Sequence, residues 1–157
     1  LLRHFSLSGG LMSHDSVRGD YGMRHADRMP VFQIDATLGA AAAVNEMLLQ
    51  SAAGVLRVFP AIPRGRAAAF RDLRAPGGLL VSARHDGAQV TGVEVRALRP
   101  GEVRLANPWP GRTVWLRERQ QKPRALRGRQ LRWTVRRGGR YTLAAAPVQI
   151  ARTNTRA

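Results

Sequence analysis

Past residue 60, apolar and polar residues alternate along short runs that glycine and proline separate. Val93 and Val95 fall on one face of the run 89–98. Glu94 and Arg96 fall on the other face. A period of two is that of half-buried antiparallel strands. The alternation predicts six strands, over 78–84, 89–98, 102–106, 112–117, 130–136 and 140–145.

Glycine pairs mark the turns that would join these strands. Asp86-Gly87 and Gly138-Gly139 stand where hairpin turns are expected. A linker rich in proline and glycine opens this region. We therefore predict a small antiparallel β-sandwich domain over residues 60–150, followed by a frayed tail over 151–157.

The region before the linker has a different texture. Residues 36–53 are apolar at helical spacing and on nearly every side, which predicts a buried helix. Asp35 or Thr37 can cap its N-terminus, and Gly54 suits its C-terminal end.

Asp35 is the candidate functional residue, because it stands where an extended run meets this helix. We expect it to be buried, and a buried carboxylate costs free energy unless it is hydrogen-bonded or used. It has two interpretations. As an N-cap it accepts a backbone N–H and benefits from the helix dipole. As a general base it takes a proton from water, which requires it to be ionised, rigid and reachable.

Other candidates are weaker. Loop acids and histidines in residues 1–30 could supply a second carboxylate or a substrate contact, or simply be solvated: Asp15, Asp20, Asp27, His14 and His25. Three tryptophans could stack on sugar rings or belong to the core: Trp109, Trp115 and Trp133.

The net charge of +16 raises the possibility of nucleic-acid binding. Of the 26 basic residues, 25 are arginine, a skew that GC-rich coding also produces. Residues 1–59 carry five acids and five bases, so the excess lies after residue 59. The stretch Arg112–Arg140 reads as a solvated sheet face with little aromatic interleaving, and we do not expect nucleic acid as a partner.

Cysteine is absent, and the four histidines show no ligand spacing: His4, His14, His25 and His85. We therefore expect no metal site and no cofactor. No run reaches the roughly 18–20 apolar residues that span a bilayer, so no membrane partner is expected. The chain opens on Leu1 without methionine or a signal-peptide pattern, and we expect an N-terminal part of the same protein to precede it.

Three segments carry a family resemblance. Residues 30–39 read PVFQIDATLG and residues 43–51 read AVNEMLLQS. Together they resemble glycoside hydrolase family ninety-five, the α-L-fucosidases and α-L-galactosidases. Residues 58–63 (VFPAIP) and 73–78 (LRAPGG) resemble the segments that follow in that family. The resemblance covers residues 30–82 and fades after about residue 106.

The resemblance implies an α+β chain. Residues 1–59 would be the terminal helices of an (α/α)6 catalytic barrel, and the β-sandwich would pack on it. It further implies an inverting hydrolase of terminal α-L-fucosyl or α-L-galactosyl residues, with fucosylated oligosaccharides as partners. Asp35 matches the family's general base. The acid glutamate and the orienting asparagines would lie upstream of Leu1. The family also points to a secreted or periplasmic protein.

Two departures concern the sugar site. Met29 stands where the family has histidine, and residues 36–38 read Ala-Thr-Leu where it has Gly-Asn-Phe. Two rival functions stay open: a non-catalytic β-module that binds carbohydrate, and a basic piece that binds nucleic acid.

Overall fold

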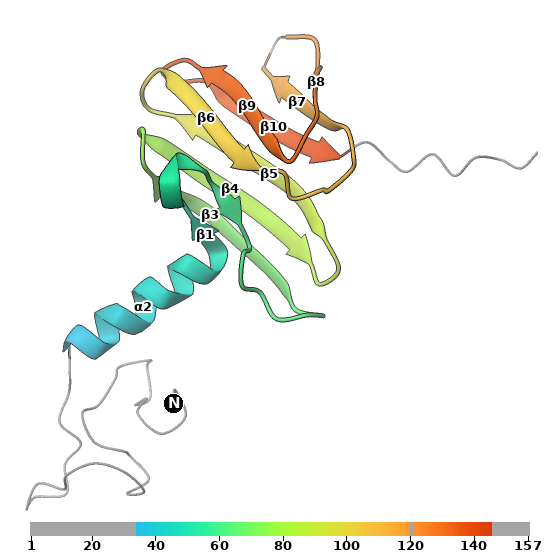
Figure 1. Cartoon of the computed structure of the whole chain (residues 1–157). Helices are drawn as coiled ribbons and strands as arrows, with labels where there is room; N and C mark the ends of the chain where they lie inside the picture. Colours follow the sequence, from blue (N-terminus) through green and yellow to red (C-terminus); the bar gives the residue numbers. More distant parts are fainter. Residues whose placement is uncertain (1–33, 120, 146–157) are drawn as a thin grey trace, which may run out of the picture. The chain divides into compact units, whose positions relative to one another are not determined.

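The computed structural model describes residues 34–119 and 121–145. The chain divides into two compact units, Leu1–Glu46 and Met47–Ala157. The described part of the first unit lies within helix α2 (Ile34–Leu48), whose last two residues belong to the second unit. The strands belong to the second unit, which we call the β unit (Figure 1).

Helix α2 begins close to where the sequence predicts but ends five residues earlier, at Leu48. None of its residues is buried, so the expectation of a buried helix is wrong. Ile34 and Leu38 are each 64% exposed, although both are large and apolar.

The helix ends at Leu48 because the residues that follow pair within the β unit. Strand β1 (Leu49–Gln50) pairs antiparallel with β2 (Arg57–Val58). A 3-10 turn, η1 (Ala52–Gly54), reverses the chain, with Ala53 and Gly54 at positive φ. Gly54 therefore lies in the turn between β1 and β2, and not at the C-terminal end of the helix. Leu49 and Val58 are both buried, which favours pairing over a further helical turn.

The larger layer of the β unit is an antiparallel sheet of six strands in the order β3-β4-β5-β10-β7-β8. Its strands are β3 (Ala67–Ala75), β4 (Leu79–Asp86), β5 (Val90–Ala97), β10 (Arg140–Ala145), β7 (Val114–Glu118) and β8 (Arg124–Leu126). The hairpin between β4 and β5 turns at Asp86-Gly87, as predicted. Asp86 Oδ1 accepts hydrogen bonds from the backbone N–H groups of Ala88 and Gln89, both at 2.8 Å.

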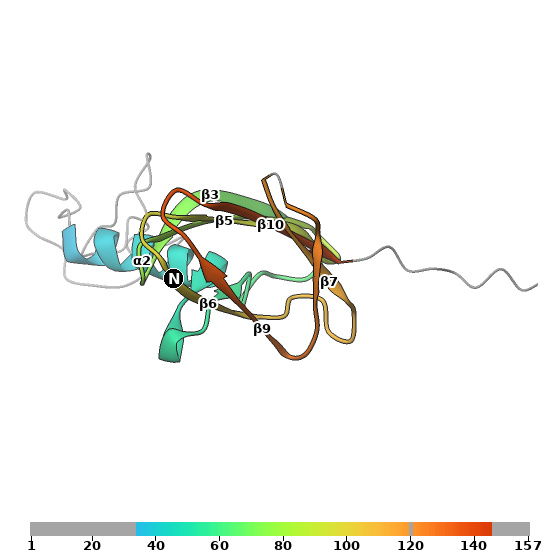
Figure 2. The same cartoon turned by 90° about the horizontal axis from the view of Figure 1, so that it is seen from above.

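The second layer consists of β6 (Gly101–Ala106) paired with β9 (Gln130–Val135). Leu56 extends it by a parallel bridge to Leu105. Leu56 N–H donates to Arg104 O at 2.8 Å, and Ala106 N–H donates to Leu56 O at 2.9 Å. Viewed from above, β3, β5 and β10 form one layer and β6 and β9 the other (Figure 2).

The core lies between the two layers, and alternate residues of each strand fill it. Val81, Val95 and Leu143 come from the large sheet, and Leu105 and Leu131 from the small one. All five are 1% exposed or less, so burial follows the period-two pattern.

The predicted Gly138-Gly139 hairpin is wrong. The turn exists, but β9 pairs with β6 whereas β10 pairs with β5 and β7. The chain therefore crosses from one layer to the other at this point. Backbone bonds to Ala97 fix the crossing: Gly138 N–H donates to Ala97 O, and Ala97 N–H donates to Gly139 O.

The six predicted strands are confirmed as β4, β5, β6, β7, β9 and β10. The predicted fold class is wrong in its helical part. The described chain is mostly antiparallel sheet with one α-helix, which does not fit the terminal helices of an (α/α)6 barrel. The small antiparallel β-sandwich fits.

Candidate functional site

Asp35 is the second residue of α2 and its side chain is exposed, so the predicted burial is wrong. Its Oδ1 accepts a hydrogen bond from the backbone N–H of Ala36 at 3.0 Å. A carboxylate in the first turn of a helix is favoured by the N–H groups that lack intrahelical partners. The carboxylate therefore accepts one backbone N–H and is open to water, which suits both a cap and a base.

The other predicted loop candidates, Asp15, Asp20, Asp27, His14 and His25, lie outside the described residues, as does His4. His85 lies on β4, where its Nδ1 accepts a hydrogen bond from Gly87 N–H at 3.0 Å. This bond assigns the remaining proton of a neutral ring to Nε2.

The three tryptophans have different surroundings. Trp109 and Trp133 are buried in the core, at 4% and 3% exposure. Trp109 Nε1–H donates to Val90 O at 2.6 Å. Trp115 is 40% exposed. It alternates with buried Val114 and Leu116 on β7, so it lies on the outer face of the six-stranded sheet.

That outer face is the second candidate site, because polar residues from four strands line up across it. Ser82 pairs with Glu94, and Glu94 pairs with Thr142. Thr142 in turn pairs with Arg117. These residues alternate with core residues along their strands, so all four present side chains away from the second layer.

The next row contains small residues between two large ones. Arg84 pairs with Gly92, and Ala144 pairs with Trp115. Gly92 and Ala144 lie on neighbouring strands and carry almost no side chain, which leaves space above the sheet. An open hollow of about 870 Å³ lies here, and both residues line it.

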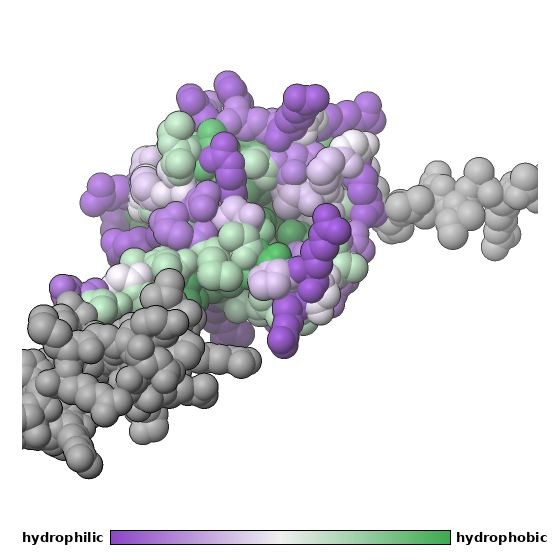
Figure 3. Space-filling view, turned by 60° about the horizontal axis from the view of Figure 1, so that its bottom comes forward, coloured by the Kyte–Doolittle hydropathy of each residue, from purple (hydrophilic) through white to green (hydrophobic). Residues whose placement is uncertain are grey.

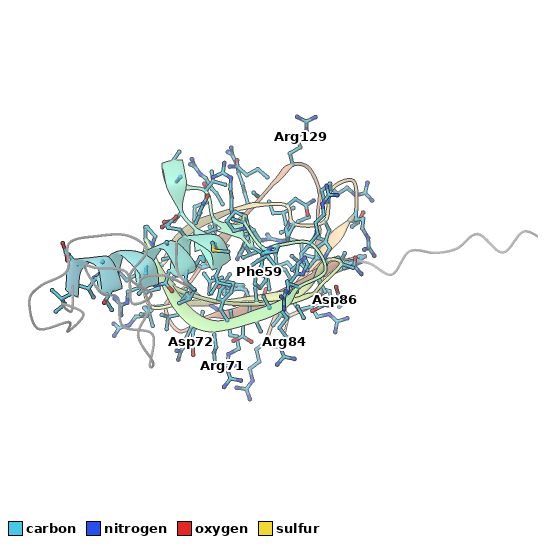
Figure 4. The ribbon with its side chains drawn as sticks, turned by 90° about the horizontal axis from the view of Figure 1, so that it is seen from below. Phe59, Arg71, Asp72, Arg84, Asp86 and Arg129 are labelled. Atoms are coloured by element: carbon cyan, nitrogen blue, oxygen red, sulfur yellow. The ribbon has the colours of Figure 1, made fainter. Side chains whose placement is uncertain are left out.

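A β-bulge shapes one wall of the hollow. The pairing of β3 with β4 shifts register between Phe70 and Leu73. Asp72, inside the bulge, has φ 54°, and its N–H donates to Ser82 Oγ at 3.0 Å. One extra residue bends the strand and changes where its side chains point. Arg71, Asp72 and Arg84 project together from the outer side of the sheet, opposite to Arg129 (Figure 4).

The charges of the hollow are mixed. Its lining contains Arg71, Arg84, Arg140, Asp72 and Glu94. Arg140 lies 3.5 Å from a Glu94 oxygen, and Asp72 lies 3.5 Å from Arg96 Nη2. Among the described residues, Arg71 and Arg84 have no ionic or hydrogen-bonding partner for their guanidinium groups.

A smaller hollow of about 370 Å³ is lined by Phe59, His85 and Trp109, among others. The Phe59 ring centroid lies 5.2 Å from that of Phe70 and 5.6 Å from that of His85. Phe59 has φ 53°, which is rare for a large side chain. Figure 4 shows Phe59 between the two layers, so this ring mainly serves packing.

Three further observations limit the chemistry of the described residues. Within them, no three His, Cys, Asp or Glu side chains gather to hold a metal ion. Their helices lack the length and apolar character needed to cross a bilayer. Hydrophilic and hydrophobic patches alternate on the face in Figure 3, so that face is not a continuous basic surface.

Sequence reasoning did not identify the outer-face hollow. For Trp115, the alternation with Val114 and Leu116 is the sequence signal that it faces outward. The bulge at Asp72 left no such signal. Neither a scan against protein-family models nor a search of curated proteins finds a match for this chain.

Proposed function

We propose that this chain supplies the general base of an inverting glycoside hydrolase acting on terminal α-L-fucosyl or α-L-galactosyl residues, and that Asp35 is the base. The observation that supports the proposal is the exposure of a carboxylate at a helix start, in the segment that resembles the family's base segment. Ala36 N–H occupies one oxygen and leaves the carboxylate reachable by water.

In this mechanism the carboxylate accepts a proton as the water oxygen bonds to the anomeric carbon. The bond from that carbon to the leaving oxygen breaks, and a general acid protonates the leaving oxygen. Inverting enzymes hold the two carboxyl groups roughly 6.5–9.5 Å apart so that water fits between them. The resemblance assigns the acid to a glutamate upstream of the segment that contains Asp35.

The test is hydrolysis of an aryl α-L-fucoside and an aryl α-L-galactoside by the protein together with any sequence its gene encodes before Leu1. Asp35→Asn should lower kcat by about 10²–10⁴-fold, the range for losing a positioned acid or base. Glu46→Gln changes the other acid of α2 and should keep full activity.

Added azide distinguishes the loss of the general base from damage to the rest of the active site. Added azide should form a glycosyl azide of inverted configuration with Asp35→Asn, because the anion needs no base to attack. A fully active Asp35→Asn protein, or equal losses in both variants, would leave Asp35 as a helix cap only.

A further inference from the structure

We infer that the outer-face hollow of the six-stranded sheet binds an acidic oligosaccharide through carboxylate or sulfate groups on its sugars. This site lies on the β unit, and the inference does not depend on the role of Asp35. It rests on the shape of the hollow, on its two guanidinium groups without partners, and on the exposed Trp115 beside it.

The shape comes from the small residues. Gly92 and Ala144 form the floor, with Arg84 beside Gly92 and Trp115 beside Ala144. A Cβ placed on Gly92 would meet nothing within 4 Å, so the space above it is open. A volume of about 870 Å³ falls in the range of roughly 300–1,000 Å³ typical of ligand sites.

The chemistry comes from the lining. Arg71 and Arg84 offer planar forks of N–H donors that match carboxylate and sulfate oxygens. Thr142 and Ser82 can exchange hydrogen bonds with sugar hydroxyls. The 40% exposed Trp115 offers an aromatic surface at the neighbouring position of the same row.

The two carboxylates favour a sugar over nucleic acid. Asp72 and Glu94 line the same hollow and can accept hydrogen bonds from sugar hydroxyls. A nucleic-acid strand brings one negative charge per phosphate and offers these carboxylates few hydroxyl donors. Each sugar of an acidic glycan carries hydroxyl donors beside its charged group, which matches two arginines without partners next to two carboxylates that can accept hydrogen bonds.

Binding of the whole chain is measured by titration calorimetry and affinity electrophoresis at constant salt. The probes are polygalacturonate, a sulfated galactan, neutral dextran and single-stranded RNA. At least one acidic glycan should bind more tightly than dextran and RNA. The two acidic probes distinguish carboxylate from sulfate as the recognised group.

Three variants locate the site. Arg84→Gln should weaken glycan binding at least about tenfold, the equivalent of one charge-assisted hydrogen bond. Gly92→Val should do the same by filling the hollow without changing any charge. Arg129→Gln removes an arginine that projects from the opposite side and should change affinity by less than about twofold.

Gly92 has no positive φ and open space around it, so Gly92→Val should fold; its thermal unfolding is checked in parallel. Three results would overturn the inference: no binding to either acidic glycan, equal losses in Arg84→Gln and Arg129→Gln, or Gly92→Val that folds and binds like wild type. Tighter binding of RNA than of both acidic glycans would overturn it as well.

Discussion

The ring of Tyr141 occupies the space that a side chain on Gly139 would need. A Cβ built on Gly139 would lie 2.6 Å from Tyr141 Oη and 2.7 Å from its Cε2. Tyr141 is buried, and its hydroxyl oxygen accepts a hydrogen bond from Arg136 N–H at 3.0 Å. At the crossing between the two layers, the ring of Tyr141 therefore packs directly against the backbone of Gly139.

We accordingly expect Gly139→Ala to destabilise the β unit. The clash is with a buried ring that cannot move freely, so the free energy of unfolding should fall by about 1–3 kcal/mol. Urea denaturation followed by near-UV circular dichroism measures it. Gly101→Ala is the matched control, because a Cβ there meets nothing within 4 Å. Equal stability of the two variants would contradict this packing.

The two buried tryptophans should respond differently to phenylalanine. Trp109→Phe leaves Val90 O without the 2.6 Å bond from the indole, at a cost of about 1–3 kcal/mol. Trp133 Nε1 is buried with no hydrogen-bond partner among the described residues. Trp133→Phe removes that unsatisfied donor along with some packing, so its loss should be smaller. Thermal unfolding measures the loss of stability in each variant. A larger loss for Trp133→Phe would refute the hydrogen-bond assignment of the two indoles.

Asp72 should tolerate glycine better than a branched residue. Its φ of 54° is left-handed, and glycine adopts that conformation without strain. Its ion pair with Arg96 is long and exposed, and contributes little. Asp72→Gly should change stability by no more than about 0.5 kcal/mol, while Asp72→Val should cost about 1–2 kcal/mol. Denaturant midpoints of the two variants measure these losses. A larger loss of stability in Asp72→Gly than in Asp72→Val would contradict the prediction.

The carboxylate of Asp86 should make the β4–β5 hairpin sensitive to acid. Backbone hydrogen bonds from Gln89 and Ala88 lower the pKa of Asp86 below its ordinary value of 3.8. A lowered folded-state pKa adds stability in full above 3.8, and that stability disappears as pH falls through the lowered value. Wild type should therefore exceed Asp86→Ala in stability near neutral pH, and the difference should shrink in acid.

Denaturation of both proteins across this pH range measures the difference. Carbon-detected NMR titration of the Asp86 carboxyl provides the pKa directly. A difference that stays constant through the acid range would show that these bonds do not depend on the charge.

Much of the sandwich could be predicted from sequence, because the core faces of β5 and β9 alternate without interruption. Strand β3 was not predicted, because its sequence AAAFRDLRA contains a bulge that breaks the period of two. Strand β8, with three residues, is too short to show a period. Local sequence also could not show which layer the strand after Gly139 joins. A turn has the same sequence pattern whether the next strand pairs with the previous one or crosses to the other layer.

The helix was predicted too long because Leu49 is apolar in a helical register, whereas its pairing with Val58 is a contact between distant residues. The exposure of Asp35 likewise could not be deduced, since apolar neighbours along the chain do not cover a residue unless packing brings them over it. The hollow beside Gly92 depends on register among four strands, which no single stretch of sequence reveals.

The bridge from Leu56 to Leu105 has a practical consequence for anyone who prepares the sandwich by itself. A clone that started at Pro60 would strip β6 of the two backbone bonds that Leu56 makes and would leave that flank unpaired. Such an edge recruits other chains. The excised piece should aggregate in solution, whereas a piece that starts at or before Met47 keeps Leu56 paired with β6 and should not aggregate.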